Sequence, residues 1–364
     1  MNNQVEQEQL KNFKVTTFQQ DLVNWFNENQ RELPWRESKN PYRIWVSEVM
    51  LQQTRVETVI PYYQAFIREF PTLEDLAEAE EDRILKAWEG LGYYSRVRNL
   101  QSAVREVVSQ YNGEVPDTRE KISTLKGVGP YTAGAILSIA YGKPEPAVDG
   151  NVMRVLSRIL LIDNDIAKSS TRIIFEKILY ELVSKVDPSS FNQGLMELGA
   201  LICTPTSPGC LLCPVREHCR AYEKGIQTEL PVKSKKKKQT SKLMAAVVIR
   251  NDRDEVLIER RPSTGLLARL WQFPNFETSI TDNQSSVLKG KLLNDYDIDA
   301  EIQEPIHKVE HIFSHLIWNI SVYETIVSGR PGERQASRKW VEISELEKHA
   351  FPVSHQKIIK QSII

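Results

Sequence analysis

The sequence contains four cysteines, and all of them fall in one short segment. Cys203, Cys210, Cys213 and Cys219 follow the spacing C-x6-C-x2-C-x5-C. Thiols clustered in this way favour a metal site over a set of disulfides. Four thiolates suit a zinc ion or a [4Fe–4S] cluster equally well, so the number of ligands leaves both open. His218, next to the last cysteine, is expected to be a bystander rather than a ligand.

Two carboxylates lie in surroundings that predict different proton affinities. Glu48 has the apolar neighbours Trp45 and Val49 on a predicted helix, and burial there would raise its pKa; an exposed surface glutamate is the plain alternative. Asp149 precedes a helix whose N-terminus would stabilise the anion, although simple helix capping explains its position as well. A protonated acid beside an anion is the pair that cleavage of a glycosidic bond requires.

A glycine-rich turn forms a third candidate site. Gly127 and Gly129 are two residues apart and permit a tight turn, and Pro130 suits the first position of the helix that follows. Backbone N–H groups of such a turn can hold a DNA phosphate without reading the base sequence. The alternative is an ordinary helix–helix connection.

The elements that would position these residues are helices in the first part of the chain. From Phe13 to about Cys219 apolar residues recur at helical spacing, and no alternating strand pattern is present. Asn40-Pro41 is expected to cap and begin the helix that carries Glu48. Breaks are predicted at five prolines, each of which should start or end a helix; these are Pro34, Pro61, Pro71, Pro116 and Pro144.

The second part of the chain has the composition of an α+β domain. A basic stretch without apolar residues (233–242) indicates a solvated linker. Beyond it, residues 245–249 and 256–258 predict a β-hairpin, residues 312–322 and 339–341 predict strands, and residues 287–294 predict a helix. We therefore expect a helical domain over 1–230, a linker over 231–242 and an α+β domain over 243–364.

Composition and charge set limits on the class of protein. The 364 residues are 41% hydrophobic and 26% charged, with a net charge of −1, which is typical of a globular protein without a global positive field. A local basic face for nucleic acid stays possible. The polar N-terminal residues 1–14 resemble no secretory signal, and no apolar run is long enough for a bilayer. A cytoplasmic, nucleoid-associated protein is expected.

Together these motifs resemble the helix-hairpin-helix base-excision DNA glycosylases, and adenine glycosylases in particular. The resemblance rests on Leu125–Gly134, on Pro146–Val152 with its Gly/Pro-rich aspartate loop, and on the cysteine spacing, and it extends from about Phe18 to His355. It implies a mainly α helix-hairpin-helix glycosylase domain with an iron–sulfur loop over 203–219, plus an α+β Nudix-like C-terminal domain. It also favours a [4Fe–4S] cluster over zinc.

The resemblance assigns roles to active-site positions. It implies that Glu48 protonates the departing adenine and that Asp149 stabilises the sugar cation, with Tyr131 and Asn151 as further active-site residues. The related endonuclease III type of glycosylase/lyase has a lysine in place of Tyr131, which forms a Schiff base with the sugar. A phenol cannot form one, so the chain is expected to be monofunctional. It would release adenine mispaired with 8-oxoguanine, or with guanine, in base-excision repair of duplex DNA.

Further positions match DNA-contacting residues of the same family. Gln53 and Tyr93 match residues that wedge into the gap and the base stack when the adenine is extruded, and Arg31 matches a residue near the adenine pocket. Ser314 and His315 match the loop that reaches the 8-oxoguanine, where a serine hydroxyl would accept a hydrogen bond from N7–H. The partner is therefore expected to be double-stranded DNA, bound by a monomer away from any membrane.

Some features depart from the family pattern or keep other functions open. Lys126 stands where many hairpins have proline, and Gln193 stands where some relatives have a glutamate near the adenine. The predicted helix over 287–294 has no glutamate, so Nudix pyrophosphate hydrolysis is not expected. The alternatives are a pyrimidine-lesion glycosylase/lyase, which Tyr131 disfavours, and a catalytically silent DNA-binding or metal-scaffold protein.

Overall fold

The computed structural model describes residues 9–234, 238–279, 283–332 and 335–363. The chain divides into two compact units: residues 1–78 with 99–235, and residues 79–98 with 236–364. Residues 235–237 of the predicted linker lie outside the described part, and the first strand begins inside the predicted linker, at Thr240. In the described residues no helix is both long and apolar enough to cross a membrane.

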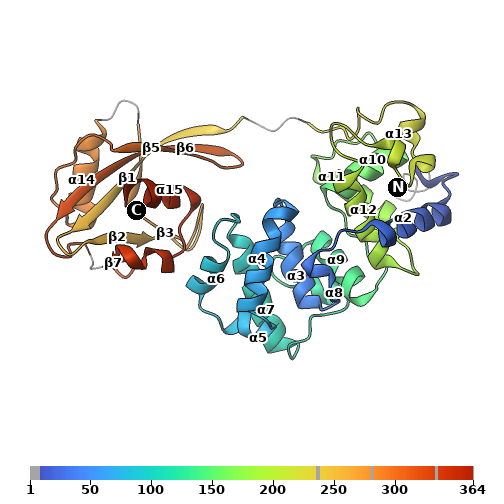
Figure 1. The fold of residues 1–364 in the computed structure, drawn as a ribbon, viewed down its shortest axis with the longest axis horizontal. Coiled ribbons are helices and arrows are strands. Elements are labelled where there is room, and N and C mark those ends of the chain that lie inside the picture. The colour runs from blue at the N-terminus through green and yellow to red at the C-terminus, as the bar shows by residue number, and fades with distance from the viewer. Residues whose placement is uncertain (1–8, 235–237, 280–282, 333–334, 364) are drawn as a thin grey trace. The chain divides into compact units, whose positions relative to one another are not determined.

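The first unit is helical, as predicted (Figure 1). No strand is assigned within residues 9–234. The helices are α2 (Val15–Asn29), η1 (Pro34–Arg36), α3 (Pro41–Leu51), α4 (Val56–Glu69), α5 (Leu73–Glu78), α7 (Ser95–Gln110, whose first four residues belong to the second unit), α8 (Arg119–Ile122), α9 (Pro130–Tyr141), α10 (Gly150–Leu160), α11 (Ser169–Leu182), α12 (Pro188–Leu201), η2 (Cys210–Leu212), η3 (Arg216–His218) and α13 (Arg220–Glu223).

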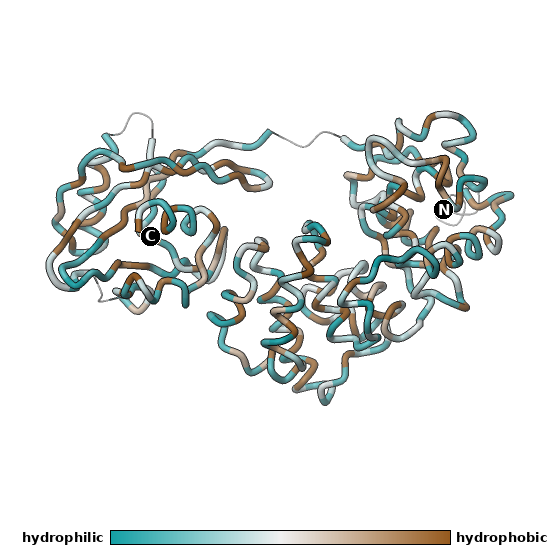
Figure 2. The backbone as a smooth tube through the Cα atoms, viewed as in Figure 1, coloured by the Kyte–Doolittle hydropathy of each residue, from teal (hydrophilic) through white to brown (hydrophobic). Residues whose placement is uncertain are grey.

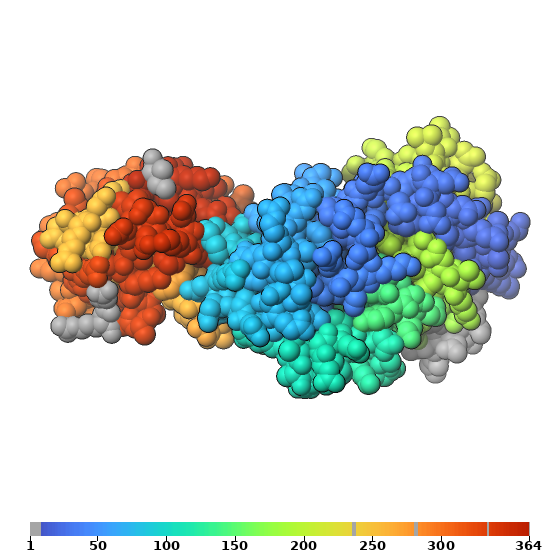
Figure 3. All heavy atoms as spheres, turned by 60° about the horizontal axis from the view of Figure 1, so that its bottom comes forward, coloured from blue at the N-terminus to red at the C-terminus, as the bar shows by residue number. Residues whose placement is uncertain are grey.

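Local signals explain where the functional helices begin. Asn40 caps α3, since its side-chain oxygen accepts a hydrogen bond from the backbone N–H of Arg43 at 3.1 Å, and α3 starts at Pro41 as predicted. Proline likewise takes the first position of α9, at Pro130. Figure 3 shows side chains of α2 to α4 (blue) forming much of one face of this unit.

One proline does not act as predicted. Pro61 lies inside α4 rather than at a helix end. At the sixth helical residue a proline removes only one early hydrogen bond of the helix. The buried face of Val59, Tyr63 and Phe66 stabilises α4 enough to offset that loss. The other four prolines lie at or close to helix ends, as expected.

The helices around the aspartate loop pack in close contact. α12 contacts α2, α9 and α10, and α3 contacts α9. The apolar stripe of α10 is buried, including Val152, Val155 and Leu156, and it packs with Phe175 of α11 and Leu195 of α12. This core holds the start of α10, where Asp149 lies, between its neighbouring helices.

The second unit is an α+β fold with one seven-stranded sheet. Its elements are α6 (Glu81–Ala87), β1 (Thr240–Asn251), β2 (Glu255–Arg260), β3 (Trp271–Gln272), β4 (Asn275–Thr278), α14 (Gln284–Tyr296), β5 (His307–Ile312), β6 (Leu316–Val327), β7 (Arg338–Glu342), η4 (Ile343–Lys348) and α15 (Val353–Ser362). The main strand order is β3-β2-β1-β6-β5, with β4 paired to β1 and β7 to β2. Within the described residues of this unit, β1 and β6 pair in parallel and the other paired strands are antiparallel.

The strand pattern of β1 explains why both faces of the sheet are covered. Alternate residues point to opposite faces of a strand: Ala246 and Val248 pack in the cluster that includes Ile358 of α15, whereas Val247 packs in the cluster that includes Leu288 of α14. Figure 2 shows apolar stretches (brown) along these strands. The predicted hairpin of β1 and β2 is confirmed, with Arg250 paired to Val256.

The predicted strand over 312–322 is wrong in one respect. The chain turns at residues 313–315, which connect β5 to β6 in an antiparallel hairpin. The backbone N–H of Phe313 donates to the carbonyl of Leu316 at 2.8 Å. Strand-forming residues on both sides of Ser314 hide this turn in the sequence, because no glycine or proline marks it.

Candidate active site

Glu48 is a buried carboxyl near the end of α3. Its residue is only 5% exposed, which confirms the prediction of burial and excludes the surface alternative. The phenol of Tyr131, at the start of α9, donates a hydrogen bond to Glu48 Oε2 at 2.5 Å. Burial raises the pKa of Glu48 to about 7; the bond from Tyr131 opposes this rise, and the negative charge of Asp149 adds to it. Glu48 can therefore carry a proton near neutral pH.

Asp149 is the N-cap of α10. Its Oδ1 accepts the backbone N–H of Val152 at 2.7 Å, and its Oδ2 accepts the side-chain amide of Asn151 at 2.9 Å. Burial raises the pKa of Asp149, while these two donors and the charge of Arg154 lower it. Because Asp149 has these donors and a cation on its side, its surroundings favour the anionic form, whereas burial of Glu48 favours the protonated form.

Both carboxyls line one cavity of about 160 Å³. Tyr131, Asn151 and Arg31 line the same cavity, so the structure brings together the five residues predicted for the adenine pocket and the chemistry. Tyr131 is half-buried, and desolvation together with the charges of Glu48 and Asp149 raises its pKa well above the usual range for a phenol. The phenol stays a hydrogen-bond donor to Glu48 rather than a second anion.

A chain of hydrogen bonds leads from Asp149 to the cysteine segment. Asn151 donates to Asp149, and Arg154 donates to Asn151 Oδ1 at 2.8 Å. The same guanidinium donates to the carbonyls of Gly199 and Cys203, each at 2.8 Å. Arg154 therefore fixes the side-chain amide that faces Asp149, and it ties α10 to the end of α12.

The pocket also contains charged residues that the sequence analysis missed. Glu197 on α12 is buried and accepts hydrogen bonds from Nε and Nη2 of Arg31, each at 2.9 Å. It also accepts hydrogen bonds from Nη1 and Nη2 of Arg36, at 3.2 and 3.1 Å. Burial alone would raise the pKa of Glu197, but the hydrogen bonds from Arg31 and Arg36 outweigh it and bring the pKa to about 2. The carboxylate holds both guanidinium groups at the cavity.

Gln193 lies one helical turn before Glu197 and lines the same cavity. Its side-chain oxygen accepts a hydrogen bond from Arg36 at 3.1 Å, and its nitrogen donates to Ser189 at 3.2 Å. The spacing of four residues between Gln193 and Glu197 is the sequence signal that could have placed Glu197 on the same helical face as Gln193. An arginine partner for Glu197, by contrast, has no local signal, since Arg31 is 166 residues away.

The glycine hairpin lies between α8 and α9. Gly127 has φ = +81°, and a side chain there would press against Asn99. Gly129 is the N-cap of α9 and provides no side-chain cap, so the first N–H groups of α9 remain available to an anion. Gln53 is exposed directly after α3 with φ = +59°. None of these three residues lines the cavity with the carboxyls.

The four cysteines line one small cavity of about 20 Å³ at the end of α12 and the start of α13. Burial raises the pKa of Cys213 and Cys219, and the neighbouring cysteines add to this rise. The buried Arg158 donates to Cys203 Sγ at 3.2 Å. In the described part of the chain, no three side chains of the usual ligand types converge closely enough to hold a single ion.

The donor set fits a thiolate-bound metal centre. Four sulfurs facing one cavity need positive charge to stay ionised together, and Arg158 supplies only part of it. Nε2 of His218 hydrogen-bonds to Asp21 of α2 at 2.7 Å, and His218 is not among the residues that line the cysteine cavity.

In the second unit, three of the predicted DNA-contacting residues line a cavity of about 400 Å³. Ser314 and His315 belong to the β5–β6 turn, and Tyr93 lies in the segment before α7. The hydroxyls of Tyr93 and Ser314 hydrogen-bond to each other. Tyr93 is 45% exposed and has φ = +46°, so core packing does not explain its position.

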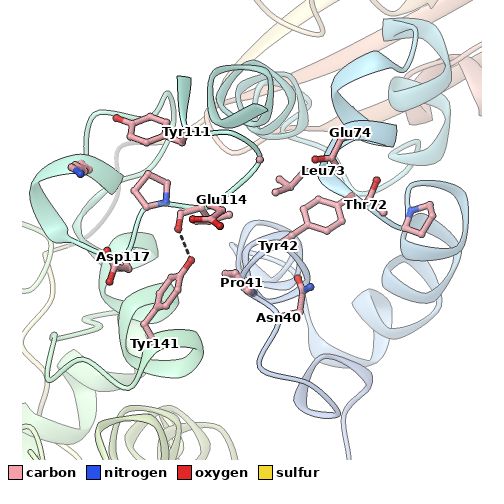
Figure 4. A pocket seen from close by; sticks show the side chains of 15 residues that line it. Asn40, Pro41, Tyr42, Thr72, Leu73, Glu74, Tyr111, Glu114, Asp117 and Tyr141 are labelled. Carbon is pink, nitrogen blue, oxygen red and sulfur yellow. Dashed lines mark hydrogen bonds between the residues drawn. The ribbon is translucent and has the colours of Figure 1, made fainter. Parts of the chain in front are cut away.

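A larger cavity, of about 630 Å³, lies at the other ends of α3 and α9 (Figure 4). It is bordered by Pro41 at the start of α3 and Tyr141 at the end of α9. Two of its phenols bond to backbone: Tyr42 donates to the carbonyl of Phe70, and Tyr141 to that of Val115. It contains none of the predicted site residues, so chemistry and not size identifies the candidate active site.

Comparison with family models covers both units. Residues 46–181 match the HhH-GPD superfamily base excision DNA repair protein, and residues 245–361 match the NUDIX domain. The chain is similar to a solved thermostable thymine-DNA glycosylase (TM-score 0.52, 30% identity, 58% of this chain and 97% of that one). It is also similar to endonuclease III in a trapped covalent DNA intermediate (TM-score 0.50, 26% identity, 58% and 97%).

Curated relatives match nearly the whole chain. The adenine DNA glycosylase of Homo sapiens is 34% identical over 95% of this chain and 74% of its own length. That of Rattus norvegicus is 33% identical over 95% and 78%, and that of Buchnera aphidicola subsp. Schizaphis graminum is 35% identical over 95% and 99%.

The helical unit, with its hairpin and aspartate loop, is that of a helix-hairpin-helix base excision DNA repair enzyme, and a Nudix-like α+β domain is joined to it. The predicted fold class is thereby confirmed. Within this class the chain belongs to the adenine DNA glycosylase family, whose members hydrolyse N-glycosyl bonds.

Replacing Glu197 with glutamine should destabilise the first unit most at neutral pH. Because the folded-state pKa of about 2 lies below the ordinary 4.5, the ionic contacts of Glu197 stabilise the fold above about pH 4.5 and are lost as the pH falls toward 2. We expect E197Q to lower the free energy of unfolding by about 2–4 kcal/mol at pH 7. In urea titrations, the difference in this free energy between E197Q and wild type should narrow as the pH falls from about 4.5 to about 3. The exposed Glu28 on α2 provides the control E28Q; an E197Q deficit that is constant with pH would contradict this origin.

Proposed function

We propose that this protein is a monofunctional glycosylase that releases adenine mispaired with 8-oxoguanine, or more weakly with guanine, from duplex DNA. The observation that carries the proposal is the single cavity shared by Glu48, whose pKa is about 7, and the N-capping carboxylate Asp149. Its partner is double-stranded DNA, and we infer that it acts on the nucleoid in the cytoplasm, as a monomer.

Glu48 is the general acid of the proposed reaction. When the N-glycosidic bond breaks, its electron pair leaves with adenine, and the proton of Glu48 neutralises that developing charge. Tyr131 supports this role by donating its hydrogen bond to Oε2, which keeps the carboxyl in a fixed orientation. Arg31, held by Glu197, lies where it can contact the extruded base.

Asp149 balances the positive charge that the sugar gains. Its carboxylate lines the same cavity and is held by Asn151 and the N–H of Val152, so it needs no rearrangement as the oxocarbenium ion forms. Water then adds to the sugar carbon and loses a proton, which restores the Glu48 carboxyl that gave its own proton to adenine. The products are free adenine and an abasic site. Because Tyr131 cannot form a Schiff base, the DNA strand is left intact.

The second unit is proposed to recognise the base opposite the adenine. The Ser314 hydroxyl can accept a hydrogen bond from the N7–H of 8-oxoguanine, which guanine lacks. His315 and Tyr93 line the same cavity. We assign Tyr93 to a contact with the base stack, and Gln53 of the first unit, separately, to the gap left by the extruded nucleotide. Gly127 and Gly129 are assigned to a phosphate contact. α14 has no glutamate in its sequence, which supports recognition rather than pyrophosphate hydrolysis by this unit.

We propose that Cys203, Cys210, Cys213 and Cys219 hold a [4Fe–4S] cluster. Four soft ligands on one cavity support it, and endonuclease III-like enzymes typically contain such a cluster. When bound, the cluster cross-links the segment from α12 to α13. Arg158 holds this segment from the protein side, through Cys203 Sγ and the carbonyls of Thr204 and Pro205.

The Glu48→Gln variant should abolish adenine release and leave duplex binding nearly unchanged, because the amide keeps the shape but has no acid proton. The assay incubates labelled A:8-oxoguanine duplex with excess enzyme and then cleaves abasic sites with alkali. The wild-type single-turnover rate should decline above about pH 7, as the pKa of Glu48 requires.

The exposed Glu28 again provides the matched control, E28Q, which should retain the wild-type rate. Full activity of E48Q would refute the acid assignment. Strand cleavage without alkali would instead indicate a lyase, and tight binding by wild-type protein without any base release would indicate a silent DNA-binding protein.

The Ser314→Ala variant should lose preference for the lesion. We expect the rate ratio between A:8-oxoguanine and A:G duplexes, at subsaturating enzyme, to fall about tenfold, the size of one hydrogen bond of roughly 1.4 kcal/mol. The A:G duplex is the internal control, since its rate should not change. An unaltered ratio would remove Ser314 from lesion recognition.

The metal prediction is tested on protein as purified. A [4Fe–4S] cluster gives a brown colour and broad charge-transfer absorbance, with about four irons per chain by metal analysis. Cys213→Ser should reduce both the iron content and the recovery of folded protein. A colourless protein that contains a stoichiometric amount of zinc would contradict the [4Fe–4S] cluster and support the zinc alternative.

A further inference from the structure

The loop that delivers Asp149 has little hydrogen bonding of its own. Residues 142–149 form neither helix nor strand, and Pro144 and Pro146 contribute no backbone N–H. Ala147 and Val148 are nevertheless buried. A buried backbone without regular structure needs partners from elsewhere, and those partners determine where Asp149 lies.

Asn192 on α12 supplies two of these partners. Its side-chain nitrogen donates to the carbonyl of Glu145 at 2.9 Å, and its side-chain oxygen accepts the N–H of Ala147 at 3.3 Å. Asn192 is completely buried, so water cannot replace either bond. The amide thus bridges the loop on both sides of Pro146, three residues before Asp149.

α9 packs against another side of this loop. A side chain at Gly134 would overlap the carbonyl of Pro146, so this glycine lets the loop pack directly on the helix that carries Tyr131. Nε of Arg119 and the hydroxyl of Tyr180 donate hydrogen bonds to the Glu145 carboxylate, at 2.5 and 2.7 Å. The side chains of Arg119 and Tyr180 are both more exposed than that of Asn192. The buried amide is therefore the contact that solvent can least replace.

We propose that Asn192 is a positioning residue of the glycosylase reaction, which sets the place of the Asp149 carboxylate relative to the sugar. This inference rests on the proposed role of Asp149. Asn192 touches neither carboxyl, and it acts through the backbone of residues 145–147. Misplacement of a reacting group by about 1 Å can cost a hundredfold in rate, which defines the size of the expected effect.

The first test compares Asn192→Leu and Asn192→Asp with wild type. Leucine removes both hydrogen bonds, while aspartate keeps the shape and the acceptor but not the donor to Glu145. Gln101→Leu is the matched control, because Gln101 is also a buried amide that donates to a backbone carbonyl, that of Leu76. Active-site titration gives the fraction of functional enzyme, and single-turnover rates are then measured on that fraction with A:8-oxoguanine duplex.

We expect both Asn192 variants to react about 10- to 100-fold more slowly per functional enzyme, and Q101L to react at the wild-type rate. If N192L does not fold, the single-turnover rate of N192D tests the inference. A rate within threefold of Q101L for the folded variants would overturn the inference, because a purely structural role lowers the functional fraction but not the rate.

The second test needs no catalysis. Duplexes with a cationic pyrrolidine abasic analogue and a neutral tetrahydrofuran abasic analogue differ in the charge that Asp149 should contact. We expect wild type and Q101L to prefer the cationic duplex, and the Asn192 variants to lose at least tenfold of that preference. An unchanged preference would overturn the positioning role. Absence of adenine release by the wild type would instead count against the proposed function itself, so the two failures remain distinguishable.

Discussion

Glu48 and Asp149 line one cavity, and burial makes the ionised form of each carboxyl more costly. The negative charge of Asp149 raises the pKa of Glu48 further. Local contacts then distinguish the two groups. The N–H of Val152, the amide of Asn151 and the charge of Arg154 lower the pKa of Asp149, whereas the phenol of Tyr131 and the charge of Arg36 lower that of Glu48. The two carboxyls therefore have unlike surroundings, which is what the proposed acid and anion require.

The helices around the site maintain this difference. α3 delivers Glu48 from one side and α10 delivers Asp149 from another, and α9 lies against both the Glu48 helix and the aspartate loop. α12 contributes Gln193 and Glu197 to the pocket, Asn192 to the loop, and Gly199 to the close approach of Asn151. A single helix thus supports the base pocket, the aspartate loop and the start of the cysteine segment. Rigid elements of this kind hold charges in place without reorganisation during reaction.

The second unit presents its polar side chains on loops rather than on the faces of its sheet. Its sheet is covered on both faces by α14 and α15, which leaves loops and edges to make contacts. The β5–β6 turn and the segment with Tyr93 provide hydroxyls and an exposed aromatic ring at one cavity. A fold with buried faces leaves such a turn free to carry the recognition role proposed for this unit.

The sequence alone determined those features that depend on near neighbours. Asn40 and Asp149 were predictable as helix N-caps because the cap and the N–H it accepts are three residues apart, and the β1–β2 hairpin follows from its own turn residues. Glu48 was predictable as buried from the apolar residues around it. The motif resemblance extended these local signals to Tyr131, Asn151 and the cysteines.

Only the tertiary structure decided the contacts between distant segments. Glu197 is 166 residues from Arg31 and 161 from Arg36, and Asn192 is 45 residues from Ala147; no spacing rule relates such pairs. The same holds for Pro61, which remains inside α4 because side chains packed against that helix outweigh a local preference. Local hydrogen bonds are encoded by adjacent residues, whereas the pKa of a buried carboxyl depends on every charge and dipole that folding brings around it.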